Sequence, residues 1–160
     1  MIRNRWVRVG LVALGIFVIN ALARLISRLT RDDTVSTAAD TGVDKISIIG
    51  AGAVVLLMAV MGALWAVRHP FSRMVFDLGA AVIGGALLSL LIAPFVGGSK
   101  PFDEGLGTFV GEFLQFLGLG ALGVLLGFLA MIVFGKDWKS RGLRRYEENY
   151  KRKTHKVVRR

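Results

Sequence analysis

The chain contains no cysteine, and it is also poor in histidine, with two residues, and in proline, with three. Without cysteine, thiol catalysis, thiolate metal sites and disulfide bonds are excluded. The two histidines, His69 and His155, lie far apart and have no companion at metal-ligand spacing, so a zinc site is not indicated. No glycine-rich phosphate loop with its lysine occurs, and no serine and histidine share an apolar segment. The sequence therefore predicts no cofactor, no metal and no enzymatic activity.

Acidic residues are also few, since 11 Asp and Glu stand against 21 Lys and Arg, which gives a formal net charge of +10. Hydrophobic residues make up 54% of the chain, above the about 45–50% that is usual for soluble domains. Long uncharged blocks alternate with short charged segments, and the last 25 residues are densely basic. This segregation is typical of a small polytopic membrane protein. It excludes a disordered chain and a soluble nucleic-acid-binding domain.

Four apolar blocks are long enough to cross a bilayer, which requires about 20 residues in a helix. Because these blocks are continuous and much longer than strands, we expect helices. The blocks cover residues 6–26, 46–67, 74–96 and 108–134. The predicted fold is an all-α, integral membrane four-helix bundle over residues 1–135, followed by a basic tail over residues 136–160.

The distribution of basic residues predicts the orientation of this bundle. With a cytoplasmic N-terminus, 16 of the 21 Lys and Arg residues fall in inner segments, as the positive-inside rule requires. We therefore expect both the N-terminus and the C-terminus in the cytoplasm. The frequent use of Ala, Gly, Val, Leu and Arg indicates a bacterial protein, and hence a multi-pass protein of the bacterial inner membrane, that is, the cell membrane.

The first apolar block has a second interpretation as a signal peptide. It begins with basic residues, and Ala21, Leu22 and Ala23 have the form of a cleavage site. Asn20 and the arginines that follow at positions 24, 28 and 31 instead indicate a helix that continues past the membrane. An uncleaved anchor is the favoured interpretation, and cleavage after Ala23 is the alternative.

Glycine spacing in the fourth block indicates close helix packing. Gly107 and Gly111 form one GxxxG pair, and Gly123 and Gly127 form another. Small residues at this spacing let two helices approach closely in lipid. Two interpretations stay open: packing within one compact bundle, or a docking face for a partner protein or a second copy of the chain.

Two carboxylates lie within the apolar blocks and need cationic partners there. Two interpretations of Arg24 stay open: the side chain extends with Arg28 to the outer lipid head groups, which is the favoured one, or it forms a structural ion pair with Glu112, which lies at the same expected depth. For Asp77 we predict Arg73, four residues earlier, or Arg68 across the turn that contains Pro70. The two carboxylates are expected about 20 Å or more apart, which is too far for paired acid–base catalysis.

The basic tail is predicted to contain an amphipathic helix that lies against anionic lipid. Glu147 and Glu148 each precede a basic residue by four positions, which favours a helix, and Trp138 is placed at the membrane interface. The basic residues expected at the lipid surface are Arg144, Arg145, Lys151, Arg152 and Lys153. No nucleic-acid-binding module surrounds these residues, so nucleic acid is not a favoured partner.

These features favour a non-enzymatic accessory or structural subunit of a larger membrane assembly. Its expected partners are anionic membrane lipids and either another protein or a second copy, bound through the glycine-rich helix faces. The alternative is a homo-oligomeric pore or small transporter, including a holin-like permeabiliser. That alternative requires a polar lining at mid-depth, and most of each apolar block lacks one.

Overall fold

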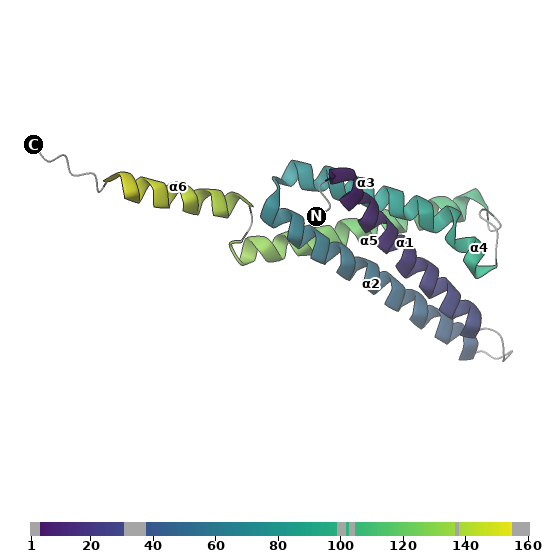
Figure 1. Cartoon of the computed structure of the whole chain (residues 1–160). Coiled ribbons are helices and arrows are strands. Elements are labelled where there is room, and N and C mark those ends of the chain that lie inside the picture. Colours follow the sequence, from purple (N-terminus) through teal and green to yellow (C-terminus); the bar gives the residue numbers. More distant parts are fainter. Residues whose placement is uncertain (1–3, 31–37, 99–101, 103–104, 137, 155–160) are drawn as a thin grey trace, which may run out of the picture.

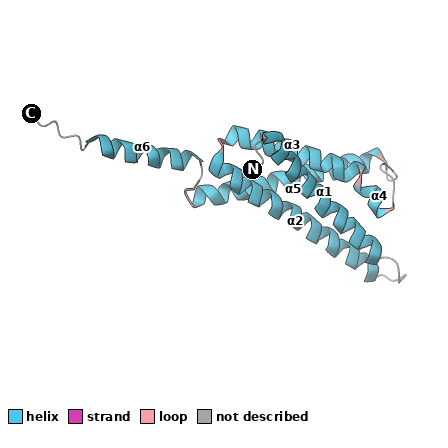
Figure 2. Ribbon diagram, viewed as in Figure 1, coloured by secondary structure: helices cyan, strands magenta, loops and turns pink. Residues whose placement is uncertain are grey.

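The computed structural model describes residues 4–30, 38–98, 102, 105–136 and 138–154, and within these ranges the chain is helical and contains no strand (Figure 2). The helices, labelled in Figure 1, are α1 (Arg5–Thr30), α2 (Ala38–Arg68), α3 (Phe71–Leu91), α4 (Ala93–Gly97), α5 (Leu106–Val133) and α6 (Trp138–Thr154).

Four helical segments are long and apolar enough to span a membrane. They start at Arg5, Lys45, Phe71 and Leu106, and each corresponds to one of the blocks predicted from the sequence. The all-α prediction with four membrane spans is therefore confirmed, and the chain is a multi-pass membrane protein.

Proline determines two breaks in the helices. α2 ends at Arg68, and Pro70 caps the start of α3, where its carbonyl oxygen accepts a hydrogen bond from the Met74 N–H at 3.1 Å. The third span, predicted as one helix over residues 74–96, is instead divided between α3 and α4 at Ile92. Pro94 lacks the N–H that would continue the ladder of α3, and its ring clashes with the preceding turn.

The closest helix pairs are not consecutive in the chain. α2 packs most extensively on α5, and α1 packs most extensively on α3. Arg5 lies beside Asp77, Ala13 beside Gly84, and Arg28 beside Val96, so α1 and α3 run parallel. Each pair thus brings together segments about 60 to 70 residues apart in the sequence.

The fully buried residues are apolar side chains on three of the long helices and glycines on the fourth, α5, whose larger side chains are partly buried against the core. Buried residues of the hydrophobic core come from α1, α2 and α3; among the largest are Ile16, Met58, Met74 and Leu78. The residues of α5 that are buried are Gly120, Gly123 and Gly127. α5 therefore packs with its backbone close to the neighbouring helices, as small residues allow.

α6 leaves the bundle beside α2 and extends away from it, at the end where α3 begins (Figure 1). The predicted helix in the basic tail is therefore present. Gly135, with φ of 59°, ends the preceding turn and changes the direction of the chain between α5 and α6. Only Gly, of the common residues, adopts this left-handed conformation without strain.

Candidate functional site

Asp77 is a buried carboxylate in the span of α3, with 3% of its side chain exposed. Arg5 of α1 forms a salt bridge with it and donates a hydrogen bond from Nε to Oδ1 at 2.7 Å. Trp65 of α2 donates from its indole N–H to Oδ2 at 3.4 Å. Three helices are thus joined at one carboxylate, which satisfies a charge that would otherwise be costly to bury.

The partner predicted for Asp77 from the sequence is wrong. Among the described residues its ion-pair partner is Arg5, whereas Arg73, one turn earlier on α3, has an exposed side chain and forms no ion pair. The reason is the adjacency of α1 and α3. Asp77 points into the bundle, where the first turn of α1 reaches it, while Arg73 lies at the open end of α3.

Arg24 and Glu112 form the second ion pair, between α1 and α5. Arg24 Nη2 lies 3.0 Å from Glu112 Oε2, so the structure brings together the two residues that the sequence analysis paired. Their side chains are 30% and 37% exposed, so this pair is less buried than the one at Asp77. Four residues later on α1, Arg28 donates to the carbonyl oxygen of Val96 at 3.3 Å and holds the end of α4.

The two ion pairs lie at opposite ends of α1. Their arginines are 19 residues apart, which corresponds to about 28 Å along a helix. This separation is too large for two carboxylates to act on one bond, since glycosidase-type pairs lie about 5–10 Å apart. No group of three metal-ligating side chains occurs among the described residues. The ion pairs therefore have the geometry of structural connections between helices.

The sequence analysis assigned no hydrogen-bond partner to two polar side chains of the spans. The amide nitrogen of Asn20 on α1 and the hydroxyl of Ser89 on α3 have no hydrogen-bond partner in the described part of the chain. Ser89 is fully buried, and Asn20 is partly buried. Both residues can be noticed in the sequence, because polar side chains are rare inside membrane spans. The adjacency of α1 and α3 could not be predicted from the sequence.

The glycines of α5 form two opposite faces. The inward glycine face consists of Gly120, Gly123 and Gly127. A Cβ atom on Gly123 would lie 2.6 Å from the Val55 carbonyl oxygen, and one on Gly127 would overlap the Ala59 carbonyl. Gly123 and Gly127 are therefore required for the contact between α5 and α2, which is the packing-within-one-bundle interpretation of that GxxxG pair.

The outward glycine face consists of Gly107, Gly111 and Gly118. These glycines are four and seven residues apart, so they lie on one side of α5. Among the described residues, a Cβ atom on any of them would have no neighbour within 4 Å. Within the described part of the chain, no helix packs against Gly107 or Gly111, and the docking-face interpretation of this pair stays a prediction.

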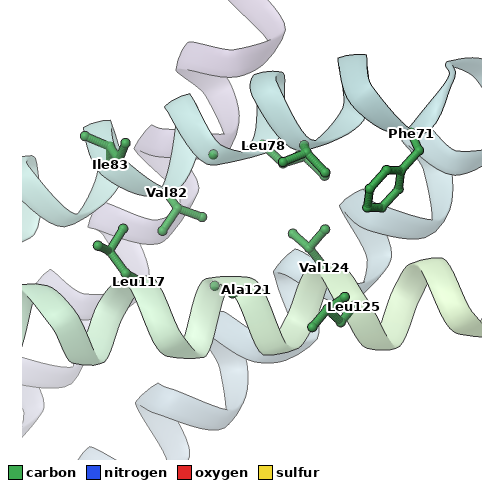
Figure 3. Close-up of a pocket in the computed structure, with 11 residues that line it drawn as sticks. Phe71, Leu78, Val82, Ile83, Leu117, Ala121, Val124 and Leu125 are labelled. Atoms are coloured by element: carbon green, nitrogen blue, oxygen red, sulfur yellow. The ribbon is translucent and has the colours of Figure 1, made fainter.

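A hydrocarbon groove of about 390 Å³ lies between α3 and α5. Figure 3 shows Phe71, Leu78 and Val82 of α3 on one side, facing Leu117 and Val124 of α5 on the other. All of its lining residues are apolar, so the groove offers no group for catalysis or for binding a polar ligand. The apolar lining is compatible with a lipid acyl chain and gives no specificity for a headgroup.

The described side chains of α6 are exposed, apart from that of Ser140, which is partly buried. Leu143, Tyr146 and Tyr150 lie three and four residues apart and form an exposed apolar stripe, and Trp138, Arg144 and Arg145 are also exposed. Lys151, Arg152 and Lys153 belong to α6 by their backbone, and their side chains lie outside the described residues. The predicted contact of this helix with anionic lipid stays a prediction.

Comparison of the chain with protein-family models, with curated proteins and with solved structures finds no match.

Proposed function

We propose that this protein is a non-enzymatic accessory or structural subunit of a membrane assembly and binds its partner through the outward glycine face of α5. The observation that carries this proposal is that no described residue covers Gly107, Gly111 and Gly118, whereas neighbouring helices cover Gly120, Gly123 and Gly127 on the same helix. Glycine at this spacing leaves a shallow surface into which another helix fits closely. A bundle that used these glycines for its own packing would leave no such surface.

Gln115 lies on the outward glycine face and supports the proposal that a partner helix binds there. It lies between Gly111 and Gly118 on an exposed part of α5, and its amide forms no hydrogen bond with another described residue. An amide that faces lipid is unfavourable, because lipid offers it no hydrogen-bond partner. Interhelical hydrogen bonds from Gln are a common element of helix association in membranes. A partner helix would bury the glycines and satisfy the amide together.

The interior of the bundle supports a structural role. Asp77 and Glu112 are each paired with arginine, and their pairs join different helices. The described interior contains apolar side chains and close glycine contacts, with Asn20 and Ser89 as its isolated polar groups. We propose on this basis a rigid membrane-embedded scaffold, located in the bacterial inner membrane, with its termini and α6 on the cytoplasmic side.

The proposed role of α6 is to hold the cytoplasmic end of the scaffold at the anionic membrane surface. Arg144 and Arg145 provide positive charge, and Trp138, Leu143 and Tyr146 provide exposed apolar surface on the same helix. Each basic residue near an anionic surface contributes about 1 kcal/mol of attraction. Charge and apolar area on one helix are the features of an interfacial amphipathic segment.

The experiment that tests the proposal places a photocrosslinking residue, p-benzoylphenylalanine, at Gln115 in native membranes. The matched control places the same residue at Leu56, which is 67% exposed on α2. We expect a crosslinked product of one discrete mass from position 115 and none from position 56, with mass spectrometry identifying a different membrane protein.

Two other results decide against the proposal. A product with the mass of two copies of this chain would replace it with the homo-oligomeric alternative, which a solute-flux assay in liposomes would then examine. Crosslinks to lipid alone at both positions would show that the outward glycine face binds no protein.

A further inference from the structure

Asn20 of α1 and Ser89 of α3 carry polar groups that are buried inside the bundle. Ser89 is fully buried, and neither its hydroxyl nor the buried amide nitrogen of Asn20 forms a hydrogen bond with a described residue. All residues within seven positions of either one in the sequence are described. A buried polar group without a hydrogen bond is costly, and in a membrane the surrounding lipid cannot supply one. The two groups therefore require a partner.

The packing of α1 on α3 places Asn20 and Ser89, called here the polar pair, opposite each other. One turn earlier on both helices, a Cβ atom added to Gly85 would lie 2.9 Å from the Cβ atom of Ile16. Asn20 follows Ile16 by four residues, and Ser89 follows Gly85 by four. Residues four apart lie on the same side of a helix. Because α1 and α3 run parallel, the next turn of each helix brings the polar pair together.

The polar pair lies between two other polar contacts that α1 makes with the third span. Arg5 bonds Asp77 at the beginning of α1, and Arg28 bonds the carbonyl oxygen of Val96 near its end. Asn20 is 15 residues after Arg5 and 8 residues before Arg28, which is about 22 Å and about 12 Å along a helix. The polar pair is thus inside the membrane-spanning part of the bundle.

The chemistry of the polar pair limits what can bind to it. The Asn20 amide nitrogen only donates hydrogen bonds, so it repels a cation, whereas the Ser89 hydroxyl both donates and accepts. An anion would lose its hydration inside the membrane at high cost. A neutral molecule that accepts from the amide and bonds the hydroxyl satisfies both groups. Water is the smallest such molecule, and its size suits a site one turn from the close contact of Gly85 with Ile16.

We infer that α1 and α3 bind one water molecule between Asn20 and Ser89. The water accepts a hydrogen bond from the Asn20 amide and donates one to the Ser89 hydroxyl oxygen. It joins the two helices at a depth where neither ion pair of the bundle reaches. The site lies inside this chain, so it is independent of the outward glycine face and of the accessory role.

Nuclear magnetic resonance tests this inference, because the chain contains three asparagines, Asn4, Asn20 and Asn149. The full chain is prepared with isotope-labelled asparagine in phosphatidylcholine nanodiscs, and the Asn20 signal is assigned by its loss in Asn20→Leu. We expect a nuclear Overhauser effect of a long-lived contact between water and the Asn20 side-chain amide. A water-soluble gadolinium chelate should leave this signal sharp. The amide of Asn149, which is exposed on α6, is the internal control and should broaden.

Ser89→Ala removes one of the two groups that hold the water and retains a small side chain at a fully buried position. We expect the water contact at Asn20 to fall at least about fivefold, because a buried water needs about two to four hydrogen-bond partners. Ser72→Ala is the matched control, since Ser72 lies on the same helix and is exposed. It should keep the contact. Circular dichroism establishes that both variants are folded.

Unfolding in SDS provides a second measurement of the same link. Asn20→Leu and Ser89→Ala should each raise the unfolding equilibrium constant about fivefold, the equivalent of about one net hydrogen bond. The double variant should also raise it about fivefold, because the second substitution has no link left to break. Effects that multiply in the double variant would overturn the inference, and so would single variants that stabilise the protein.

The spectra separate a bound water from two other arrangements. A direct contact between the Asn20 amide and the Ser89 side chain, without a water contact, would show that the two groups bond each other and would overturn the inference. A water contact that persists in Ser89→Ala would show that Ser89 does not hold the water. Broadening of Asn20 equal to that of Asn149 would show bulk water instead of a bound molecule. Both results would also overturn it.

Discussion

The two glycine faces of α5 have the same residue type at similar spacing but opposite surroundings. On the inward glycine face a single added carbon at Gly123 or Gly127 would meet the backbone of α2. On the outward glycine face an added carbon at Gly107, Gly111 or Gly118 would contact no residue that the structure describes. A GxxxG motif thus predicts close approach to some helix, but which helix, and in which molecule, depends on the face.

The largest effect is expected from Gly127→Leu. The new side chain would overlap the backbone of Ala59 and Ala63, which cannot move without separating α2 from α5. We expect a destabilisation above the about 3 kcal/mol that overpacking usually causes, so that little monodisperse protein is recovered from detergent. Gly118→Leu, on the same helix, is the control and should purify as the unmodified chain does. Equal recovery of the two variants would abolish the distinction between the faces.

The second-largest loss of stability is expected from breaking the ion pairs that join the helices. Arg5→Met leaves Asp77 buried without a cation, and we expect a loss of about 2–3 kcal/mol, below the range for fully buried pairs because Arg5 is 38% exposed. Arg24→Met should cause a loss of at most about 1 kcal/mol, because the side chains of Arg24 and Glu112 are 30% and 37% exposed. Unfolding in SDS, followed by circular dichroism, measures both. Adding Asp77→Leu to Arg5→Met should restore part of the stability, and a further loss would contradict the role of charge burial.

The spans could be predicted from the sequence because the bilayer sets both their length and their polarity. Pro70 likewise predicted the end of α2, and Pro94 accounts for the break between α3 and α4. The neighbours of each helix could not be predicted, since every span is apolar on all sides and lipid contact requires the same side chains as helix contact. This is why Arg24 and Glu112 could be paired by depth alone, while Asp77 was assigned to its own helix and not to α1.

A third prediction concerns the outward glycine face alone. Gly107→Leu with Gly111→Leu should leave stability unchanged within about 0.5 kcal/mol or raise it, because leucine favours a helix more than glycine does. The crosslink from position 115 should fall at least about tenfold, since bulky side chains prevent close approach of a partner helix. A stability measurement and a crosslinking yield on the same preparation separate the two effects. A destabilised bundle would show that these glycines serve the interior after all.

Gln115→Leu is expected to have a smaller effect on association. Interhelical hydrogen bonds in membranes contribute about 0.6 kcal/mol on average, so the affinity for the partner should fall about threefold. The protein remains folded, because the Gln115 side chain is exposed and contacts no helix of the bundle through a hydrogen bond. Gln115→Asn, which keeps the amide on a shorter side chain, is the matched control. Co-purification at several detergent concentrations measures the affinity, and an unchanged value would remove Gln115 from the interface.

The smallest expected effect is a pH dependence of stability at His69, which the outward glycine face should not share. The pKa of His69 is lowered by burial and by the arginines around it, so protonation disfavours the folded state. Its contribution to stability is complete above about pH 6.5, the value of an unperturbed histidine, and is lost as the pH falls through the lower pKa of the folded protein. The outward glycine face, with Gln115, carries no titratable side chain. Between pH 7.5 and pH 5.5, therefore, unfolding in SDS should become slightly easier while the crosslinking yield from position 115 stays constant.

His69→Gln should remove the pH dependence of unfolding, because glutamine cannot be protonated in this range. A crosslinking yield that changes with pH in the His69→Gln variant would mean that charged groups of the partner face Gln115, and the outward glycine face would then be part of a polar interface.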